Sequence, residues 1–197
     1  SHFFYERMTL KSFVEHRALA YMRMLAVLEE VPFEIDEIKF QLGAEVFFSP
    51  NLFHEDDILA LCIENTRILL LELPTDMMPP YFDETIYQIQ SYNITPVIAH
   101  VERYPYVMDN LPILCDWEDR GIYAQINAGT ILKGGRQAKL CLDLLRWNLA
   151  HIIASDAHSI AHRPPNLSDG INAVRVHLGE QIAESGYIFS LCQEPHS

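Results

Sequence analysis

The sequence predicts a parallel α/β fold, either a barrel or an open sheet, because apolar segments of strand length alternate with segments of helix length. The clearest strand is 67–73, where Ile68 to Leu71 form the continuous apolar run typical of a parallel sheet buried on both faces. Five strands are expected, at 39–46, 67–73, 95–99, 122–126 and 151–154. The chain has 197 residues and no internal repeat or evident linker, so a single domain over 1–197 is expected.

Helices are expected between these strands. The first, at 8–30, begins where Thr9 can cap it and ends before Pro32. Its apolar side chains fall on one helical face: Phe13, Val14, Ala18, Tyr21, Leu25 and Leu28. The others are expected at 55–64, 83–92, 111–120, 137–149 and 167–185. Gly121 is a suitable residue to end the helix at 111–120.

The charge balance argues against several classes of partner. The formal net charge is −13, so the surface should repel nucleic acid and anionic membranes. No apolar run is long enough to cross a bilayer. A phosphorylated substrate remains compatible, because bound metal ions reverse the sign of the field inside a site.

The four cysteines, Cys62, Cys115, Cys141 and Cys192, include no C-x-x-C pair. We interpret them as thiols in a reducing compartment, which suggests a cytoplasmic protein. None is followed six positions later by the arginine that cysteine-based phosphatases require, so a thiolate nucleophile is disfavoured.

Polar residues mark the predicted strand ends. Able to bind a metal or a polar ligand are Glu45, Glu72, His100, Asn127 and Asp156, with His158 two residues further on. The carboxyl ends of parallel strands meet at one rim, where active sites form. Carboxylates and imidazoles without thiolates suit Mn, Fe or Zn, and burying them without cations would be costly. The alternative is a solvated polar rim.

Two segments resemble a known family. Residues 98–104 (IAHVERY) and 154–158 (ASDAH), the latter followed by Arg163-Pro164-Pro165, resemble the PHP-type (polymerase and histidinol phosphatase) tyrosine phosphatases of bacterial capsule and exopolysaccharide operons. Shorter segments fit the same family in the same order: Gly43-Ala44-Glu45, Leu71-Glu72 and 125–128 (QINA). The resemblance runs over nearly the whole chain.

The resemblance implies a distorted TIM-like (β/α)7 barrel that binds up to three metal ions, with Mn²⁺ favoured over Fe or Zn. By motif, Glu45 corresponds to the carboxylate that bridges two metals, and Glu72 and His100 correspond to ligands of the second metal. Asp156 corresponds to a ligand of the first metal, and His158 and His2 to ligands of the third. Arg103 and Arg163 correspond to the two arginines that grip the phosphate.

The implied activity is metal-dependent hydrolysis of phosphotyrosine on a protein. The implied partner is the autophosphorylated tail of a bacterial tyrosine kinase that regulates polysaccharide export. In this mechanism metals activate a water molecule, while Arg103 and Arg163 bind the phosphate oxygens through their planar guanidinium groups.

The sequence departs from the family at its beginning. The family opens with a strand that carries His-x-His, and this sequence has no such motif, so two histidine ligands of the first metal and one ligand of the third have no counterpart. We therefore expect the domain to be N-terminally incomplete, either as a segment of a longer protein or with an impaired site. Two alternatives stay open: a PHP phosphoesterase for histidinol phosphate or another small ester, and a non-catalytic remnant that binds a kinase tail. A nuclease-like domain is disfavoured by the acidic charge.

Overall fold

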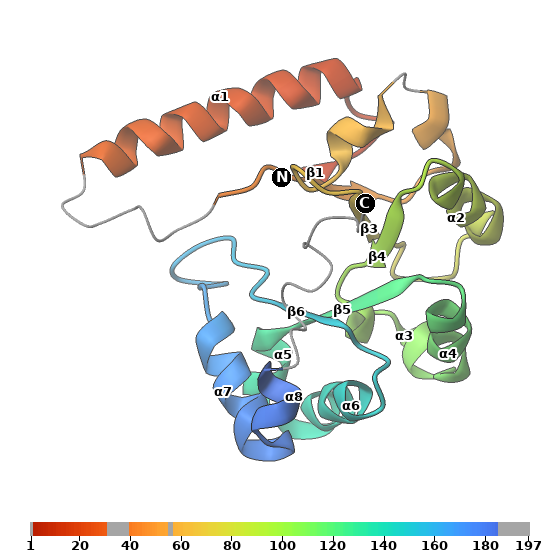
Figure 1. Ribbon diagram of the computed structural model, residues 1–197, viewed down its shortest axis with the longest axis vertical. Coiled ribbons are helices and arrows are strands. Elements are labelled where there is room, and N and C mark those ends of the chain that lie inside the picture. Colours follow the sequence, from red (N-terminus) through yellow and green to blue (C-terminus); the bar gives the residue numbers. More distant parts are fainter. Residues whose placement is uncertain (1, 31–39, 55–56, 185–197) are drawn as a thin grey trace.

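A sheet of parallel strands forms the centre of the computed structural model, which describes residues 2–30, 40–54 and 57–184 (Figure 1). The strands are β1 (His2–Phe3), β2 (Glu45–Phe47), β3 (Ile68–Glu72), β4 (Thr95–Ile98), β5 (Tyr123–Asn127) and β6 (Ile152–Ala154). They follow one another across the sheet in the order β1-β2-β3-β4-β5-β6, and every pair is parallel. The connections between these sequential strands contain the helices, and the sheet curls as a half-barrel.

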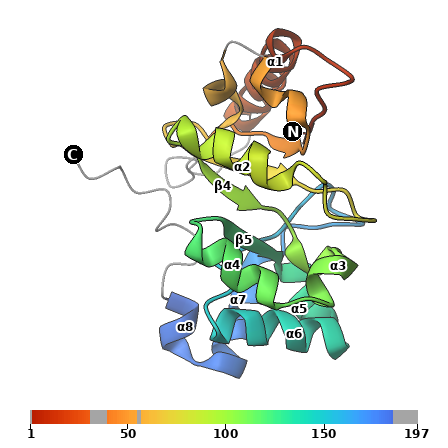
Figure 2. The same ribbon diagram turned by 90° about the vertical axis from the view of Figure 1, so that its right-hand side faces the viewer.

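The connecting segments contain helices and short 3-10 turns. The helices are α1 (Leu10–Glu29), α2 (Phe82–Ser91), α3 (Pro105–Met108), α4 (Pro112–Asp119), α5 (Ala128–Lys133), α6 (Gly135–Arg146), α7 (Leu167–Leu178) and α8 (Glu180–Glu184). The 3-10 turns are η2 (Pro50–His54), η3 (Ile58–Leu61) and η4 (Val101–Arg103). Figure 2 shows α2, α4 and α6 one below the other along the same side of the molecule.

The core lies between the sheet and these helices. Leu69 and Leu71 of β3 are fully buried together with Ile86 of α2 and Trp117 of α4. Successive side chains of a strand point to opposite faces. The face of β3 away from this core therefore carries Glu72.

Most predicted elements are confirmed. Each of the five predicted strands has a counterpart, and the helices expected at 83–92, 111–120 and 137–149 correspond to α2, α4 and α6. The predicted cap of α1 is present, since the Ser12 amide donates to the Thr9 hydroxyl at 3.2 Å. The helix expected at 167–185 is divided into α7 and α8 at Gly179, whose φ of 90° is left-handed and ends a helix. Ser185 lies outside the described residues.

The prediction for the strand at 39–46 is only partly correct, because β2 begins at Glu45. The Glu64 amide donates to the Leu42 carbonyl at 2.7 Å, and the Ile63 amide donates to the Ile68 carbonyl at 2.9 Å. Leu42 therefore bonds to the turn before β3, and β2 begins only at Glu45. Lys39 lies outside the described residues.

Two further differences concern local elements. The helix expected at 55–64 is wrong within the described residues, which form the single 3-10 turn η3 there; residues 55 and 56 are not described. So short a segment more readily forms a 3-10 turn than an α-helix. The additional strand β1 was not predicted, and it forms because His2 and Phe3 pair in parallel with Glu45 and Val46.

The predicted apolar face of α1 packs only at its beginning. Leu10 and Phe13 are buried, whereas no residue from 14 to 29 is buried. Figure 1 shows that the later part of α1 extends beyond the edge of the sheet, so this part of the helix has little to pack against. None of the helices in the described ranges is long and apolar enough to span a membrane. Cys62, Cys115 and Cys141 are free thiols, and Cys192 is not described.

Candidate metal centre

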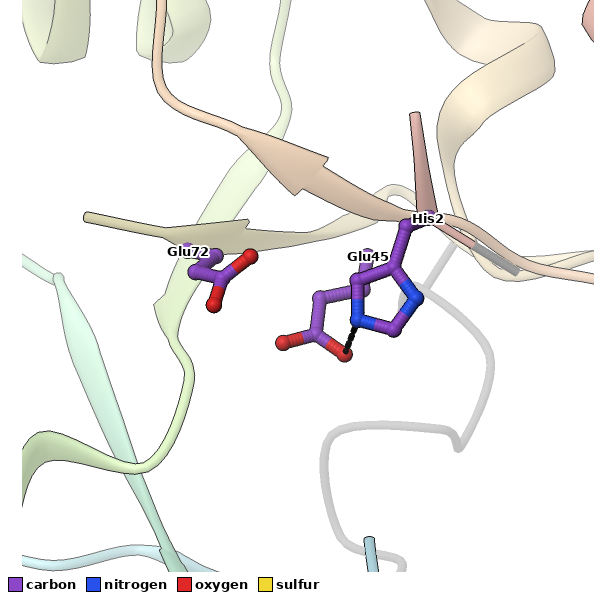
Figure 3. Close-up of side chains that lie close together, drawn as sticks. All are labelled: His2, Glu45 and Glu72. Atoms are coloured by element: carbon purple, nitrogen blue, oxygen red, sulfur yellow. Dashed lines mark ion pairs between the residues drawn. The ribbon is translucent and has the colours of Figure 1, made fainter. Parts of the chain in front are cut away.

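Four of the predicted ligands come together on the sheet. We call His2, Glu45, Glu72 and His100 the carboxylate–imidazole cluster. His2 Nε2 lies 3.3 Å from one oxygen of Glu45, and His100 Nε2 lies 2.9 Å from the other. The same His100 nitrogen is 3.6 Å from Glu72 Oε1. Figure 3 shows His2 paired with Glu45, with Glu72 beside them.

The strand register explains how these side chains meet. His2 is opposite Glu45 in the β1–β2 ladder, and Glu45 is opposite Leu70 in the β2–β3 ladder. Glu72 follows Leu70 by two residues and so points to the same face. Contrary to the prediction that metal ligands follow strand ends, His2 and Glu45 are the first residues of their strands, and their side chains meet on the face of the sheet.

His100 reaches the cluster through an unusual backbone conformation. It follows β4 with a φ of 37° and a ψ of 53°, a left-handed conformation that costs free energy for a residue other than glycine. Its amide donates to the Gln125 side-chain carbonyl at 2.9 Å. The Gln125 amide in turn donates to Asn127 Oδ1 at 2.8 Å. Gln125 therefore fixes the turn that carries His100.

Electrostatics favour an ionised Glu45. Burial raises the pKa of this carboxyl group, but the hydrogen bond from His100 and the charges of His100, His2 and Arg103 outweigh burial and leave the pKa below its ordinary value. An ionised carboxylate beside imidazole nitrogens is the form that binds a divalent cation.

These residues fit a metal ion. One ligand atom each of His2, Glu45 and Glu72 lies within 4.8 Å of the others. His100 is 3% exposed, and its second ring nitrogen, Nδ1, is buried without a hydrogen-bond partner among the described residues. Nitrogen and oxygen donors without sulfur suit Mn, Fe or Zn. Two carboxylates held side by side on a largely buried surface gain most from a cation between them.

The remaining predicted residues form a second group, which we call the Asp156 cluster: Asp156, Arg103, Arg163, His158 and Asn127. Asp156 Oδ2 accepts hydrogen bonds from Arg103 at 2.6 Å, Arg163 at 2.8 Å and Asn127 at 3.3 Å. His158 Nδ1 lies 3.3 Å from Asp156 Oδ1. Like His100, Asp156 follows its strand in a left-handed conformation, with a φ of 49°.

The two clusters are neighbours. The rings of His2 and His158 are 5.5 Å apart, centroid to centroid. Asp156 and His158, predicted as ligands, do not join the group of three close ligand atoms formed by His2, Glu45 and Glu72. Asp156 is instead engaged by both arginines, so their guanidinium groups converge on a single carboxylate oxygen.

A cavity of about 280 Å³ opens beside the Asp156 cluster. Both predicted arginines line it, together with Lys133 and Leu132 of α5. The side chains of Arg103 and Arg163 are 39% and 43% exposed, so a ligand in the cavity can reach both.

Sequence reasoning gave no role to two supporting residues, Gln125 and Glu102. Glu102 is 2% exposed, and its Oε1 accepts from the Asn127 amide at 3.2 Å and the Thr130 hydroxyl at 2.9 Å. Burial raises the pKa of Glu102 despite these hydrogen bonds. The signal that could have revealed both is a polar residue within or directly after an apolar strand, where an unpaired side chain would be costly.

A sequential parallel sheet with carboxylates and imidazoles gathered on one face defines an α/β protein with a candidate metal site. The comparison with protein families is more specific. The chain belongs to the family described as capsular polysaccharide synthesis, CpsB/CapC, whose model matches residues 4–190. This confirms the resemblance to the capsule-operon phosphatases.

Curated relatives carry tyrosine phosphatase names. The putative tyrosine-protein phosphatase CapC of Staphylococcus aureus is 33% identical over 151 residues, covering 70% of this chain and 59% of the relative. The tyrosine-protein phosphatase YwqE of Bacillus subtilis (strain 168) is 32% identical over 125 residues, covering 62% of this chain and 49% of the relative. The chain thus spans 59% and 49% of the lengths of these two proteins.

A solved structure has the same fold. It comes from the crystal structures of YwqE from Bacillus subtilis and CpsB from Streptococcus pneumoniae, described as unique metal-dependent tyrosine phosphatases. The TM-score is 0.75 at 23% identity, and the match covers 92% of this chain and 73% of that chain. The likeness confirms the predicted α/β fold with a parallel sheet.

Proposed function

We propose that this chain carries the greater part of a metal-dependent phosphatase site that hydrolyses phosphotyrosine on a protein. The observation that carries the proposal is the convergence of Arg103 and Arg163 on one oxygen of Asp156, beside four potential metal ligands. Two guanidinium groups aimed at one oxyanion position are suited to phosphate oxygens. The tyrosine phosphatase names of the relatives support the choice of substrate.

The proposed metal ligands are His2, Glu45, Glu72 and His100, with Asp156 and His158 contributing to a complete site. We favour Mn²⁺ over Fe or Zn and expect up to three ions in a full-length protein, in keeping with the description of YwqE and CpsB as metal-dependent. When bound, divalent metals supply Lewis acidity toward a water molecule and the phosphoryl group.

The chain's own residues would bind and orient the phosphate. Arg103 and Arg163 would exchange the Asp156 oxygen for phosphate oxygens and stabilise the charge that develops in the transition state. Asn127 donates to the same Asp156 oxygen and would hold this carboxylate in place during the exchange. Glu102 and Gln125 would keep the turn after β4 fixed, because Glu102 accepts from the Asn127 amide at the end of β5 and Gln125 accepts from the His100 amide.

The finer features of fold and context are proposals that membership of the family supports. We propose that residues 1–197 act as one domain and that the half-barrel belongs to a distorted (β/α)7 barrel of the PHP type. The proposed partner is the phosphorylated tail of a bacterial tyrosine kinase in the cytoplasm, and the proposed process is capsule or exopolysaccharide synthesis, supported by the family's description.

The test is phosphate release from a phosphotyrosyl peptide with added Mn²⁺. We expect release by the wild-type chain that stops with EDTA and falls about 100-fold in Arg163→Ala, because a transition-state contact is lost. Arg120→Ala is the matched control, since Arg120 pairs with Asp83 and Asp116, away from the cavity. No release above buffer would contradict the proposal, and release from histidinol phosphate alone would favour a small-ester phosphatase.

A further inference from the structure

The cavity beside the Asp156 cluster gathers positive charge in an acidic protein. The chain has 14 Lys and Arg residues against 27 Asp and Glu residues. Three of the 14, Arg103, Lys133 and Arg163, nevertheless line this one cavity, and among the described residues Asp156 is the only carboxylate that lines it. An anion is therefore attracted to this cavity despite the formal net charge of −13.

The three cationic side chains differ in whether a carboxylate pairs with them. Arg103 and Arg163 are both paired with Asp156. In the part of the chain that the structure describes, no carboxylate forms an ion pair with Lys133. Lys133 is also exposed, so its ammonium group is accessible to a ligand.

Local structure keeps Lys133 at the wall of the cavity. It is the last residue of α5, and Gly134 follows with a φ of 71°, which ends the helix. The α5 helix is itself held to the site, because Glu102 accepts a hydrogen bond from Thr130 in the same helix. The position of Lys133 relative to Arg103 is therefore set by buried contacts.

The remaining walls limit what the cavity can hold. Leu132 and Pro164 provide apolar surface beside the cations, and Leu132 is 43% exposed. At about 280 Å³ the cavity is at the lower end of ligand-sized pockets, so it suits one or two side chains and not a folded segment. A phosphorylated aromatic side chain with an acidic neighbour matches this combination of surfaces.

We propose that Lys133 binds a second anionic group of the substrate, the carboxylate of an acidic residue adjacent to the phosphotyrosine. This inference rests on the proposed function and specifies its substrate class as acidic phosphotyrosyl peptides. Arg103 and Arg163 bind the phosphate, and Lys133 binds the neighbouring carboxylate. A lysine suits this task because its flexible stem carries a point charge that can follow a mobile carboxylate.

The test measures binding of fluorescent peptides to the full chain in the presence of Mn²⁺, by anisotropy. The peptides carry a non-hydrolysable phosphonate analogue of phosphotyrosine followed by either Glu or Gln. We expect the wild type to bind the Glu peptide about fivefold more tightly, the gain of one partly exposed ion pair. Lys133→Ala should bind the two peptides equally, and Lys133→Glu should prefer the Gln peptide.

Lys139→Ala is the matched control, because Lys139 is an exposed lysine of α6 that does not line the cavity. It should keep the wild-type ratio of the two dissociation constants. This ratio is not changed by a variant that only loosens the fold. Equal binding of the two peptides by the wild type, weak binding of both, or an unchanged ratio in Lys133→Ala would overturn the proposal. Hydrolysis of p-nitrophenyl phosphate by the wild type, measured separately, reports whether the phosphatase proposal stands.

Discussion

Two histidines at opposite ends of the sheet have very different surroundings. His100 follows β4, and its Nε2 lies 2.9 Å from a carboxylate oxygen of Glu45. His151 precedes β6, and its Nδ1 accepts a hydrogen bond from the Ala124 amide at 3.2 Å. The ring of His151 packs edge-on against Tyr123, with centroids 4.9 Å apart.

The difference shows how strand direction separates chemistry from packing. At the end where β4 leaves the sheet, carboxylates from β2 and β3 meet His100. At the end where β6 begins, burial lowers the pKa of His151, and the nearby Glu118 offsets this only in part. His100 follows its strand and meets the carboxylates, whereas His151 precedes its strand and packs, so the same residue type serves a candidate metal site at one end and packing at the other.

The largest effect should come from a change in the carboxylate–imidazole cluster, where His100 lies. Glu45→Gln should reduce phosphatase activity by about 100-fold or more, because the amide cannot supply the charged oxygens that face both His2 and His100. The measurement is the initial rate of phosphate release at saturating Mn²⁺. Glu29→Gln, at an exposed position of α1, serves as the control and should retain wild-type activity. Activity within threefold of the wild type in Glu45→Gln would mean that the cluster does not support catalysis.

A smaller effect is expected at Gln125, which contacts His100 and is not itself a candidate metal ligand. Gln125→Leu removes the acceptor for the His100 amide and leaves that buried donor unpaired. We expect a loss of about tenfold in Mn²⁺ affinity, typical of residues that orient a metal ligand. Isothermal titration calorimetry measures the affinity, and thermal unfolding checks that the variant is folded. An unchanged affinity in a folded variant would show that His100 does not depend on Gln125.

The smallest effect should come from a change of His151, at the opposite end of the sheet. Because the pKa of His151 is lowered in the folded state, its contribution to stability is complete above the unfolded value of 6.5 and is lost as the pH falls toward the folded pKa. His151→Gln should abolish this dependence and leave phosphatase activity unchanged. Urea unfolding of both proteins at pH 7.5 and pH 5.5 measures it. The comparison of the two ends fails if the wild type and the variant lose stability equally on acidification.

Much of the fold and part of the candidate site could be predicted from the sequence. Glu72 ends β3, and His100 and Asp156 follow β4 and β6, so their placement at the carboxyl ends of strands depends only on strand direction. The start of β2 could not be predicted, because the preceding residue Leu42 accepts a hydrogen bond from the distant Glu64 amide. The separation of Asp156 from the carboxylate–imidazole cluster could not be predicted, because it goes with hydrogen bonds from Arg103, Arg163 and Asn127 that join distant segments.

Supporting residues are the hardest to predict. Gln125 lies inside a strand, and its side-chain oxygen accepts from the His100 amide only because of the left-handed turn at His100. The role of Glu102 depends on its hydrogen bond from Thr130 of α5, a helix that the sequence pattern did not predict. Both roles depend on contacts between segments that are distant in the sequence.

The central claim is that the carboxylate–imidazole cluster binds a divalent metal. The most direct test is titration of the wild-type chain, His100→Gln and His151→Gln with Mn²⁺ by isothermal titration calorimetry. The account predicts saturable binding in the wild type and in His151→Gln, and a loss of at least about tenfold in affinity in His100→Gln. Equal Mn²⁺ affinity in all three proteins, or no binding by the wild type, would contradict it.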